Sequence, residues 1–310
     1  MKYISQAPGK IIITGEHFVV HGGFALAAAI NKFVKVTAEI SPTTKIISKT
    51  ISGSQKNIDN QLQPLYNSLR KLTTFLNENR NLKITIDSDI PYMSGLGSSG
   101  SVSVSLINSA AAALGHALND DELFKFSMIS EKIIHGNPSG IDITVPIKGG
   151  AFLFKKGKDI INVEINKLEF IVVLSGIQSD TYSMIKKVHE TKTRNPKIFD
   201  LLVKSSSLFS QFAASSIKNQ DYDSLGSVMN FHQTALNYIG VSNNKLDYLI
   251  TMLLKYGAQS AKLTGSGGGG AIIALAPTKY SSKIINNIKK LGYNAFLVKL
   301  PVKGVDLWKK

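Results

Sequence analysis

The sequence contains no cysteine, and it has only 9 prolines and one tryptophan among its 310 residues. The absence of cysteine excludes disulfide frameworks, thiolate nucleophiles and zinc or iron–sulfur sites that depend on cysteine ligands. It is also typical of a protein from a reducing compartment.

Long hydrophobic runs are missing as well. The longest uninterrupted apolar stretch covers residues 24–30, far short of the roughly 20 residues that span a bilayer. Pro8, Gly9 and Lys10 interrupt the N-terminus before the apolar region of a signal peptide could form. We therefore expect a cytoplasmic protein that does not bind membranes.

Acidic residues are scarce relative to basic ones. The chain has 36 Lys and Arg against 21 Asp and Glu, for a formal charge of +15. Residues 1–155 carry 15 basic and 11 acidic side chains, and residues 156–310 carry 21 and 10. Such an excess suggests anionic ligands, namely a nucleotide, a phosphorylated metabolite, nucleic acid or a membrane surface. A surface that is simply kept soluble by charge explains it equally well.

The pattern of apolar residues predicts a mixed α+β protein of two domains, consistent with a length of 310 residues. Residues 155–159 are the expected linker. Strands are predicted at 11–13, 33–40, 82–87, 171–174 and, as the last strand, 271–275. Helices are predicted at 61–79, from Ser98 to about Gly115, from Asn119 or Asp120 to about His135, and at 181–194, 198–217 and 221–238.

Eight of the 25 glycines lie in two short loops, Gly95-Leu-Gly-Ser-Ser-Gly100 and Gly265-Ser-Gly-Gly-Gly-Gly270. Glycine clusters let backbone N–H groups approach a phosphate closely, and a helix that follows adds its positive N-terminal dipole. Either loop could equally form a tight turn or a close helix–strand contact. Both match G-x-G-x-x-G, but the expected strand–turn–helix–strand context is missing, which excludes a dinucleotide-binding fold. The signatures of P-loop proteins and protein kinases are absent too.

Two other segments carry residues that suit phosphoryl transfer. Lys10 opens a buried strand, with Glu16 and His17 beyond its far end, while Glu131 lies on a predicted helix and Asp142 follows a Gly/Pro/Ser turn. One acid together with a hydroxyl can hold Mg²⁺, and the other can activate an acceptor hydroxyl. The lysine would offset the negative charge that develops.

Three ordered motifs resemble those of the GHMP small-molecule kinases, a superfamily named after galactokinase, homoserine kinase, mevalonate kinase and phosphomevalonate kinase. They are Pro8-Gly-Lys…Gly-Glu-His17, Pro91-Tyr-Met-Ser-Gly-Leu-Gly-Ser-Ser99 and Lys262-Leu-Thr-Gly-Ser-Gly-Gly-Gly-Gly270. Within the superfamily, Gly15-Glu-His-Phe-Val-Val-His-Gly22 and His135-Gly-Asn-Pro-Ser-Gly-Ile-Asp142 are similar to segments of the mevalonate kinases. The matches extend over residues 7–270.

The resemblance implies a two-domain GHMP kinase fold. Residues 1–157 would form an N-terminal domain similar to domain 2 of ribosomal protein S5 and carry the phosphate loop. Residues 158–310 would form a ferredoxin-like C-terminal domain. The implied reaction is ATP-dependent phosphorylation of the 5-hydroxyl of mevalonate in isoprenoid biosynthesis, with Mg²⁺ as cofactor, and the resemblance is compatible with a homodimer.

The resemblance also implies roles for particular residues. Asp142 would be the base or electrostatic partner of the attacking hydroxyl, and Lys10 would lie beside it and neutralise charge. Mg²⁺ would be held by Ser99 and Glu131. The phosphates of ATP would be bound by Gly95, Leu96, Gly97, Ser98, Ser99 and Gly100, and mevalonate by Lys10, Glu16, His17, Asp142 and Thr181.

The sequence departs from the family pattern at two places. The family usually has alanine where this chain has Gly100, so we expect a looser phosphate loop that keeps its amide groups. The stretch Gln178-Ser-Asp-Thr181 lacks the basic residue that relatives more often carry there.

Two other functions are consistent with parts of the sequence. The first is a kinase of the same fold that acts on phosphomevalonate or another small alcohol. The second is a nucleic-acid-binding protein, suggested by the positive charge and the S5-like domain. The basic residues are dispersed, however, and no RRM, KH or zinc-finger spacing occurs. We therefore expect ATP and mevalonate, and no nucleic acid, as partners.

Overall fold

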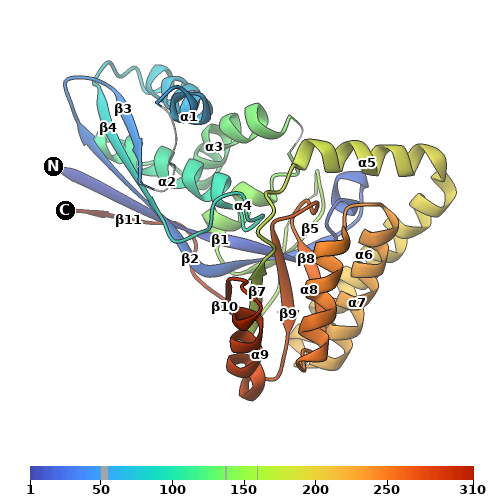
Figure 1. Ribbon diagram of the computed structural model, residues 1–310. Helices are drawn as coiled ribbons and strands as arrows, with labels where there is room; N and C mark the ends of the chain where they lie inside the picture. Colours follow the sequence, from blue (N-terminus) through green and yellow to red (C-terminus); the bar gives the residue numbers. More distant parts are fainter. Residues whose placement is uncertain (50–54, 137, 159) are drawn as a thin grey trace.

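Two β-sheets, each covered by helices, organise the chain (Figure 1). The computed structural model describes residues 1–49, 55–136, 138–158 and 160–310. The first half of the chain forms β1 (Lys2–Thr14), the 3₁₀ helix η1 (Phe18–His21), β2 (Ala25–Ile40), β3 (Lys45–Ser48), α1 (Gln55–Phe75), β4 (Leu82–Ser88), α2 (Ser98–Ala113), α3 (Asp120–His135), α4 (Ile141–Lys148) and β5 (Ala151–Phe154). The second half forms β6 (Ile161–Asn162), β7 (Leu168–Leu174), α5 (Thr181–Arg194), α6 (Pro196–Lys218), α7 (Tyr222–Tyr238), α8 (Asn244–Lys255), β8 (Ser260–Thr264), β9 (Ala271–Leu275), α9 (Thr278–Lys290), β10 (Ala295–Leu300) and β11 (Asp306–Lys309).

The first sheet is built around the long antiparallel pair β1 and β2, in the order β11-β1-β2-β4-β3, with β5 beside β2 and β6 beside β5. Along residues 25–30 of β2, both faces are buried. Leu26, Ala28 and Ile30 join the main core, whereas the alternating alanines between them join a second cluster on the opposite face. This alternation follows from the two-residue repeat of a strand.

Helix α2 lies across the centre of the first sheet, against β1 and β2, with α1, α3 and α4 around it. Its many serines and alanines are small, so it packs closely on the strands. Helix α3 begins with a capping box, in which Asn119 and Glu122 each accept a hydrogen bond from the other's backbone N–H. These two helices carry the loop and the acid that the sequence singled out, Gly95–Gly100 and Glu131.

The second sheet is antiparallel, in the order β10-β7-β9-β8. Helices α7 and α8 pack against β8, α6 lies against α7, and α9 packs against β10 and β7 (Figure 1). The last strand, β11, returns to the first sheet and pairs with β1, so the two chain ends lie together. Both β6 and β11 thus join the first sheet from beyond residue 157, and the domain boundary at 157/158 stays a prediction.

The α+β class and most predicted elements are confirmed, including the helix starts at Ser98 and Asp120 and the strands at 82–87 and 171–174. The prediction that 271–275 is the last strand is wrong, because β10 and β11 follow it. Other elements were not predicted, namely strands β3, β5, β6 and β8, the 3₁₀ helix η1 and helices α4, α8 and α9. Asp159, at the end of the expected linker, lies outside the described residues. Among the described helices, none is both long and apolar enough to cross a bilayer.

Candidate active site

The loop at residues 95–100 leads directly into α2, with Gly97 at the N-cap in the left-handed region (φ 79°). Lys10, from β1, lies beneath this loop. Its backbone N–H donates to the Leu96 carbonyl at 2.9 Å, and its Nζ donates to the Gly95 carbonyl at 3.2 Å. The Leu96 side chain is buried, so this residue can offer a ligand only its backbone. The amides of the first turn of α2, beginning with Ser98, have no acceptor within the helix, which suits an anion.

Asp142 lies in the first turn of α4, and its carboxylate faces the same lysine. Asp142 Oδ1 is 3.1 Å from Lys10 Nζ, and the Asp142 side chain is 31% exposed whereas that of Lys10 is 4% exposed. A buried ammonium group is therefore fixed next to a carboxylate that solvent or a substrate can reach. The structure brings together the two residues predicted to be catalytic.

Glu131, near the end of α3, is fully buried close to this pair. Burial and, to a smaller extent, the negative charge of Asp142 raise its pKa to about 7, while the Ser99 hydroxyl and the positive charge of Lys10 oppose the shift. Ser99 is in the first turn of α2. The two predicted metal ligands thus lie near each other, with Ser99 inside the phosphate loop. Among the described residues, no three His, Cys, Asp or Glu side chains are grouped as in a metal site made only of protein ligands.

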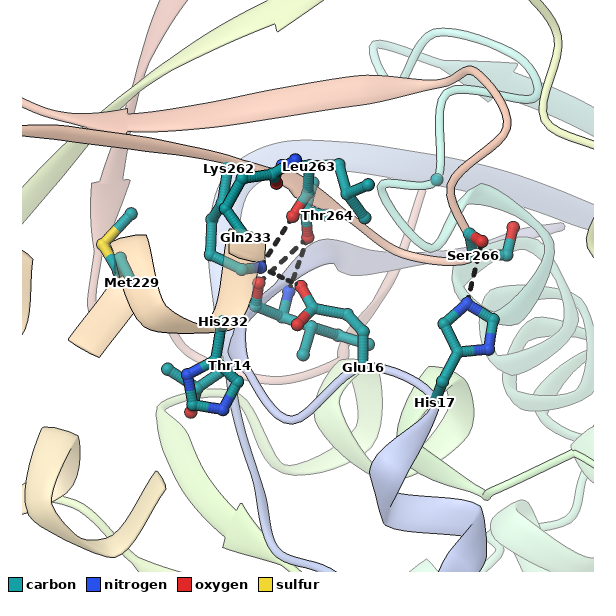
Figure 2. Close-up of polar contacts among 12 residues, drawn as sticks. Thr14, Glu16, His17, Met229, His232, Gln233, Lys262, Leu263, Thr264 and Ser266 are labelled. Carbon is teal, nitrogen blue, oxygen red and sulfur yellow. Dashed lines mark hydrogen bonds and ion pairs between the residues drawn. The ribbon is translucent and has the colours of Figure 1, made fainter. Parts of the chain in front are cut away.

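Glu16 is placed differently from these groups. Its carboxylate is buried and pairs with the ammonium group of Lys262, which comes from β8 of the second sheet (Figure 2). Lys262 also donates to the Leu263 carbonyl at 2.6 Å. Burial raises the pKa of Glu16 and lowers that of Lys262, and the attraction between the two opposes both shifts. The Glu16 carboxylate is therefore shielded from solvent and paired with Lys262, a residue 246 positions away in the sequence.

The next residue, His17, turns the other way (Figure 2). Its Nε2 lies 2.8 Å from the Ser266 carbonyl oxygen. Because a carbonyl can only accept, Nε2 carries the ring proton and donates the hydrogen bond. Loss of hydration lowers the pKa of His17 to about 4, which leaves the ring neutral at pH 7. The hydroxyl of Thr181, at the start of α5, donates to Ser266 Oγ at 3.1 Å. Ser266 thus connects His17 and Thr181, two of the predicted substrate contacts.

The loop at residues 265–270 packs against the phosphate loop. A Cβ added to Gly265 would lie 3.0 Å from the Gly95 carbonyl oxygen, and one added to Gly270 would lie 2.9 Å from that of Ser94. On its other side, the loop lies against Val241, where a Cβ on Gly267 would come within 2.3 Å of the carbonyl oxygen. Its glycines therefore allow close backbone contact with neighbouring segments.

Three residues of this region were not assigned a role from the sequence: Lys262, Thr264 and Ser266. The Thr264 hydroxyl accepts from the Ile12 N–H at 2.9 Å and donates to the Ile12 carbonyl at 3.1 Å, which ties the second sheet to β1. All three belong to the third motif. The available signal was a lysine between two apolar residues, Ala261 and Leu263, because a lysine that is buried requires a counter-charge.

Comparison with known proteins gives a consistent set of matches. The family model "GHMP kinases N terminal domain" matches residues 63–150, and "GHMP kinases C terminal" matches residues 213–294. The chain is 30% identical to the mevalonate kinase of Pyrococcus furiosus and 31% identical to that of Thermococcus sibiricus, in each case over 99% of this chain and 98% of the relative. It is 28% identical to the mevalonate kinase of Aeropyrum pernix, over 98% and 97%.

Solved structures agree with these matches. Mevalonate kinase from L. major in complex with R-mevalonate superposes with a TM-score of 0.85 at 26% identity, covering 96% of each chain. The Methanococcus jannaschii mevalonate kinase gives a TM-score of 0.83 at 24% identity, covering 96% of this chain and 98% of that one. The latter shows a shared fold.

Proposed function

The chain belongs to the GHMP kinase family, and from that premise we propose that it is a mevalonate kinase, which transfers the γ-phosphoryl group of ATP to the 5-hydroxyl of mevalonate. Full-length relatives at about 30% identity support this assignment, as does the structural match to a mevalonate complex. The observation that carries the mechanism is the pair of Asp142 and Lys10, 3.1 Å apart beside the phosphate loop.

In the reaction, the 5-hydroxyl oxygen forms a bond to the γ-phosphorus while the bond from that phosphorus to the bridging oxygen breaks and ADP leaves. Asp142 accepts the hydroxyl proton or a hydrogen bond from it, which increases the negative charge on the attacking oxygen. The ammonium group of Lys10 stabilises that charge and the charge on the transferred phosphoryl group. Because Lys10 is buried and held by Gly95, it is already in place before the substrates bind.

The phosphates of ATP bind at the N-terminus of α2 in this proposal. The amides of residues 95–100 and the helix dipole favour negative charge there. Because the contacts come from the backbone, substitutions of Ser98 should affect binding of ATP less than any change that moves the loop.

We also propose that Mg²⁺ is held by Ser99 and Glu131. A hydroxyl and a carboxylate are the oxygen donors that Mg²⁺ prefers, and this ion is usually held by one or two carboxylates plus substrate phosphates. The Ser99 hydroxyl is near enough to Glu131 to affect the pKa of its carboxyl group. When bound, Mg²⁺ would neutralise charge on the ATP phosphates.

Mevalonate would contact Lys10, Asp142, His17 and Thr181. Since Nε2 of His17 donates to Ser266, its Nδ1 is the nitrogen that can accept from a substrate hydroxyl. Glu16 acts indirectly in this proposal, because its carboxylate pairs with Lys262. The pair fixes the turn that carries His17.

A coupled assay of ADP formation tests the assignment. With ATP and Mg²⁺, we expect kcat/KM for mevalonate to exceed that for phosphomevalonate, homoserine and galactose by at least about 100-fold, since unmatched polar groups in a site discriminate strongly. A preference for any of the other acceptors would contradict the assignment.

A further inference from the structure

Gly100, in the first turn of α2, lies directly against the backbone of Asp142. A Cβ built on Gly100 would be 1.8 Å from the Asp142 carbonyl oxygen, 2.6 Å from its carbonyl carbon and 3.2 Å from its Cβ. Among the glycines of the described residues, none has a shorter distance from an added Cβ to the nearest heavy atom. The atom in the way belongs to a helix backbone, so it cannot rotate aside as a long side chain would.

Glycine at this position is not required by the backbone conformation. Gly100 is in a regular part of α2 and is not among the residues with positive φ. Within a helix, glycine is a poorer residue than alanine. Glycine fits here because a side chain would overlap the backbone of Asp142, the proposed catalytic acid. The expectation that Gly100 loosens the phosphate loop stays a prediction, and the close approach of Asp142 indicates a steric role besides it.

The surroundings of α4 leave it little freedom to move away. Its C-terminal end is held by the segment before β11, where a Cβ on Gly304 would lie 2.0 Å from the Ile147 carbonyl oxygen and the Gly150 N–H donates to Val302 at 2.8 Å. An atom added at Gly100 must therefore displace the first turn of α4, which carries Asp142.

Lys10 cannot follow such a displacement. It is 3% exposed, and its Cγ lies only 2.8 Å from the place that a Cβ on Gly97 would take. Its Nζ also donates a hydrogen bond to the Gly95 carbonyl. If the first turn of α4 moves while Lys10 stays, the Asp142 carboxylate loses its position beside Lys10 Nζ.

We propose that Gly100 is a positioning residue for phosphoryl transfer. By lacking a side chain, it lets the first turn of α4 rest on the first turn of α2, and this contact sets the distance between the Asp142 carboxylate and Lys10. The inference rests on the proposed function. It also implies that a chain with alanine at this position must hold α4 farther from α2.

The first test is the substitution Gly100→Ala. We expect kcat for mevalonate to fall by about 10- to 100-fold, the effect of a displacement of about 1 Å in a catalytic group, with KM values changed less than about threefold. Gly226→Ala is the matched control. Gly226 is also inside a helix, α7, but the nearest atom to its added Cβ is Ser260 Oγ at an ordinary 3.5 Å. This control should retain wild-type kcat.

A double-mutant cycle separates positioning from general damage. If Gly100 acts through the Asp142 carboxylate, adding Gly100→Ala to Asp142→Asn should leave the residual rate of Asp142→Asn unchanged within about twofold. A further loss as large as that in the wild-type background would overturn the proposal. So would a Gly100→Ala variant that is folded by circular dichroism and has wild-type kcat.

A second measurement does not depend on a folded variant. In a crystal structure of the wild-type chain with ATP and mevalonate, an ideal Cβ on Gly100 should lie less than about 3 Å from the Asp142 carbonyl oxygen, as it does here. An ordinary van der Waals separation would remove the steric basis of the proposal. The wild-type rate with mevalonate is measured first, so failure of the kinase assignment is distinguished from failure of this inference.

Discussion

At the scale of single residues, the charged groups of the site differ in how much of each side chain is exposed to solvent. Lys10 and Asp142 form a pair that is open on the side of the carboxylate. Glu16 and Lys262 form a pair that is fully buried. The first arrangement can react with a substrate, whereas the second can only shape the structure around it. We therefore predict a catalytic role for the first pair and a supporting role for the second.

The first residue-scale prediction concerns Asp142. The isosteric substitution Asp142→Asn should lower kcat by about 10³-fold or more, because it removes both the proton acceptor and the negative charge beside the attacking oxygen. Steady-state kinetics with mevalonate measures the effect. Asp121→Asn, an exposed acid in the first turn of α3, is the control and should keep full activity. Equal activity of the two variants would contradict the mechanism.

The second prediction concerns the buried pair. Lys262→Met should reduce the free energy of unfolding by about 3–5 kcal/mol, since it leaves the Glu16 carboxylate buried without its partner. The double variant Lys262→Met with Glu16→Gln should recover most of that loss, because no buried charge is left. Urea unfolding at pH 7 measures both. Losses that simply add in the double variant would show that the two charges do not stabilise each other.

At the scale of elements, a buried histidine joins two helices of the second half. His232, on α7, donates from Nδ1 to the Val228 carbonyl and accepts at Nε2 from Ser206 on α6, both at 3.0 Å. Loss of hydration lowers its pKa from 6.5 to about 3. The helix pair therefore contains a neutral ring that resists protonation.

This contact predicts how stability depends on pH. Between pH 6.5 and 3, His232 takes up a proton in the unfolded chain but not in the native protein. The contribution of His232 to the free energy of unfolding is therefore fully present above pH 6.5 and is lost as the pH falls. At about pH 5, roughly 1.5 units below the ordinary value, the loss is about 2 kcal/mol from this residue. Chemical unfolding at about pH 7.5 and about pH 5 should show that His232→Gln removes this part of the loss. His189→Gln, at an exposed position, is the control; an equal change in both variants would contradict the account.

The elements also show what the sequence could and could not predict. Helices α2 and α3 were found because glycine and capping residues mark their ends. The roles of the phosphate loop, Lys10, Asp142 and Glu131 were predicted from motif positions, and the structure places Asp142 beside Lys10 and Lys10 against the loop. The partner of Glu16 was not found, since Lys262 comes from a strand of the other sheet and only the folded chain brings the two together. The contact of Gly100 with the Asp142 carbonyl was hidden for the same reason.

At the scale of the whole molecule, the two halves meet at the site. Thr264 forms hydrogen bonds with Ile12 of β1, the Ser266 carbonyl accepts a hydrogen bond from His17, and β11 pairs with β1. The third motif thus serves the site by tying the second sheet to the first. The positive charge is distributed differently, with most of the excess after residue 155.

This charge predicts a dependence on salt. ATP and mevalonate are both anions, and a chain of formal charge +15 should attract them over distances that salt screens. We expect kcat/KM to fall by about 3- to 10-fold between low and high ionic strength, with kcat nearly constant. Initial rates in NaCl at fixed Mg²⁺ measure it. A flat response would mean that the charge serves solubility only.

The most direct test of the central claim is the identity of the product. Incubation of the protein with ATP, Mg²⁺ and mevalonate, followed by ³¹P–¹H correlation NMR and mass spectrometry, should show a phosphomonoester on carbon 5 of mevalonate and an equal amount of ADP. In the same incubation, the Asp142→Asn variant should form both products at least about 10³-fold more slowly. Absence of the ester with wild-type protein, or a phosphate on another atom, would contradict the assignment.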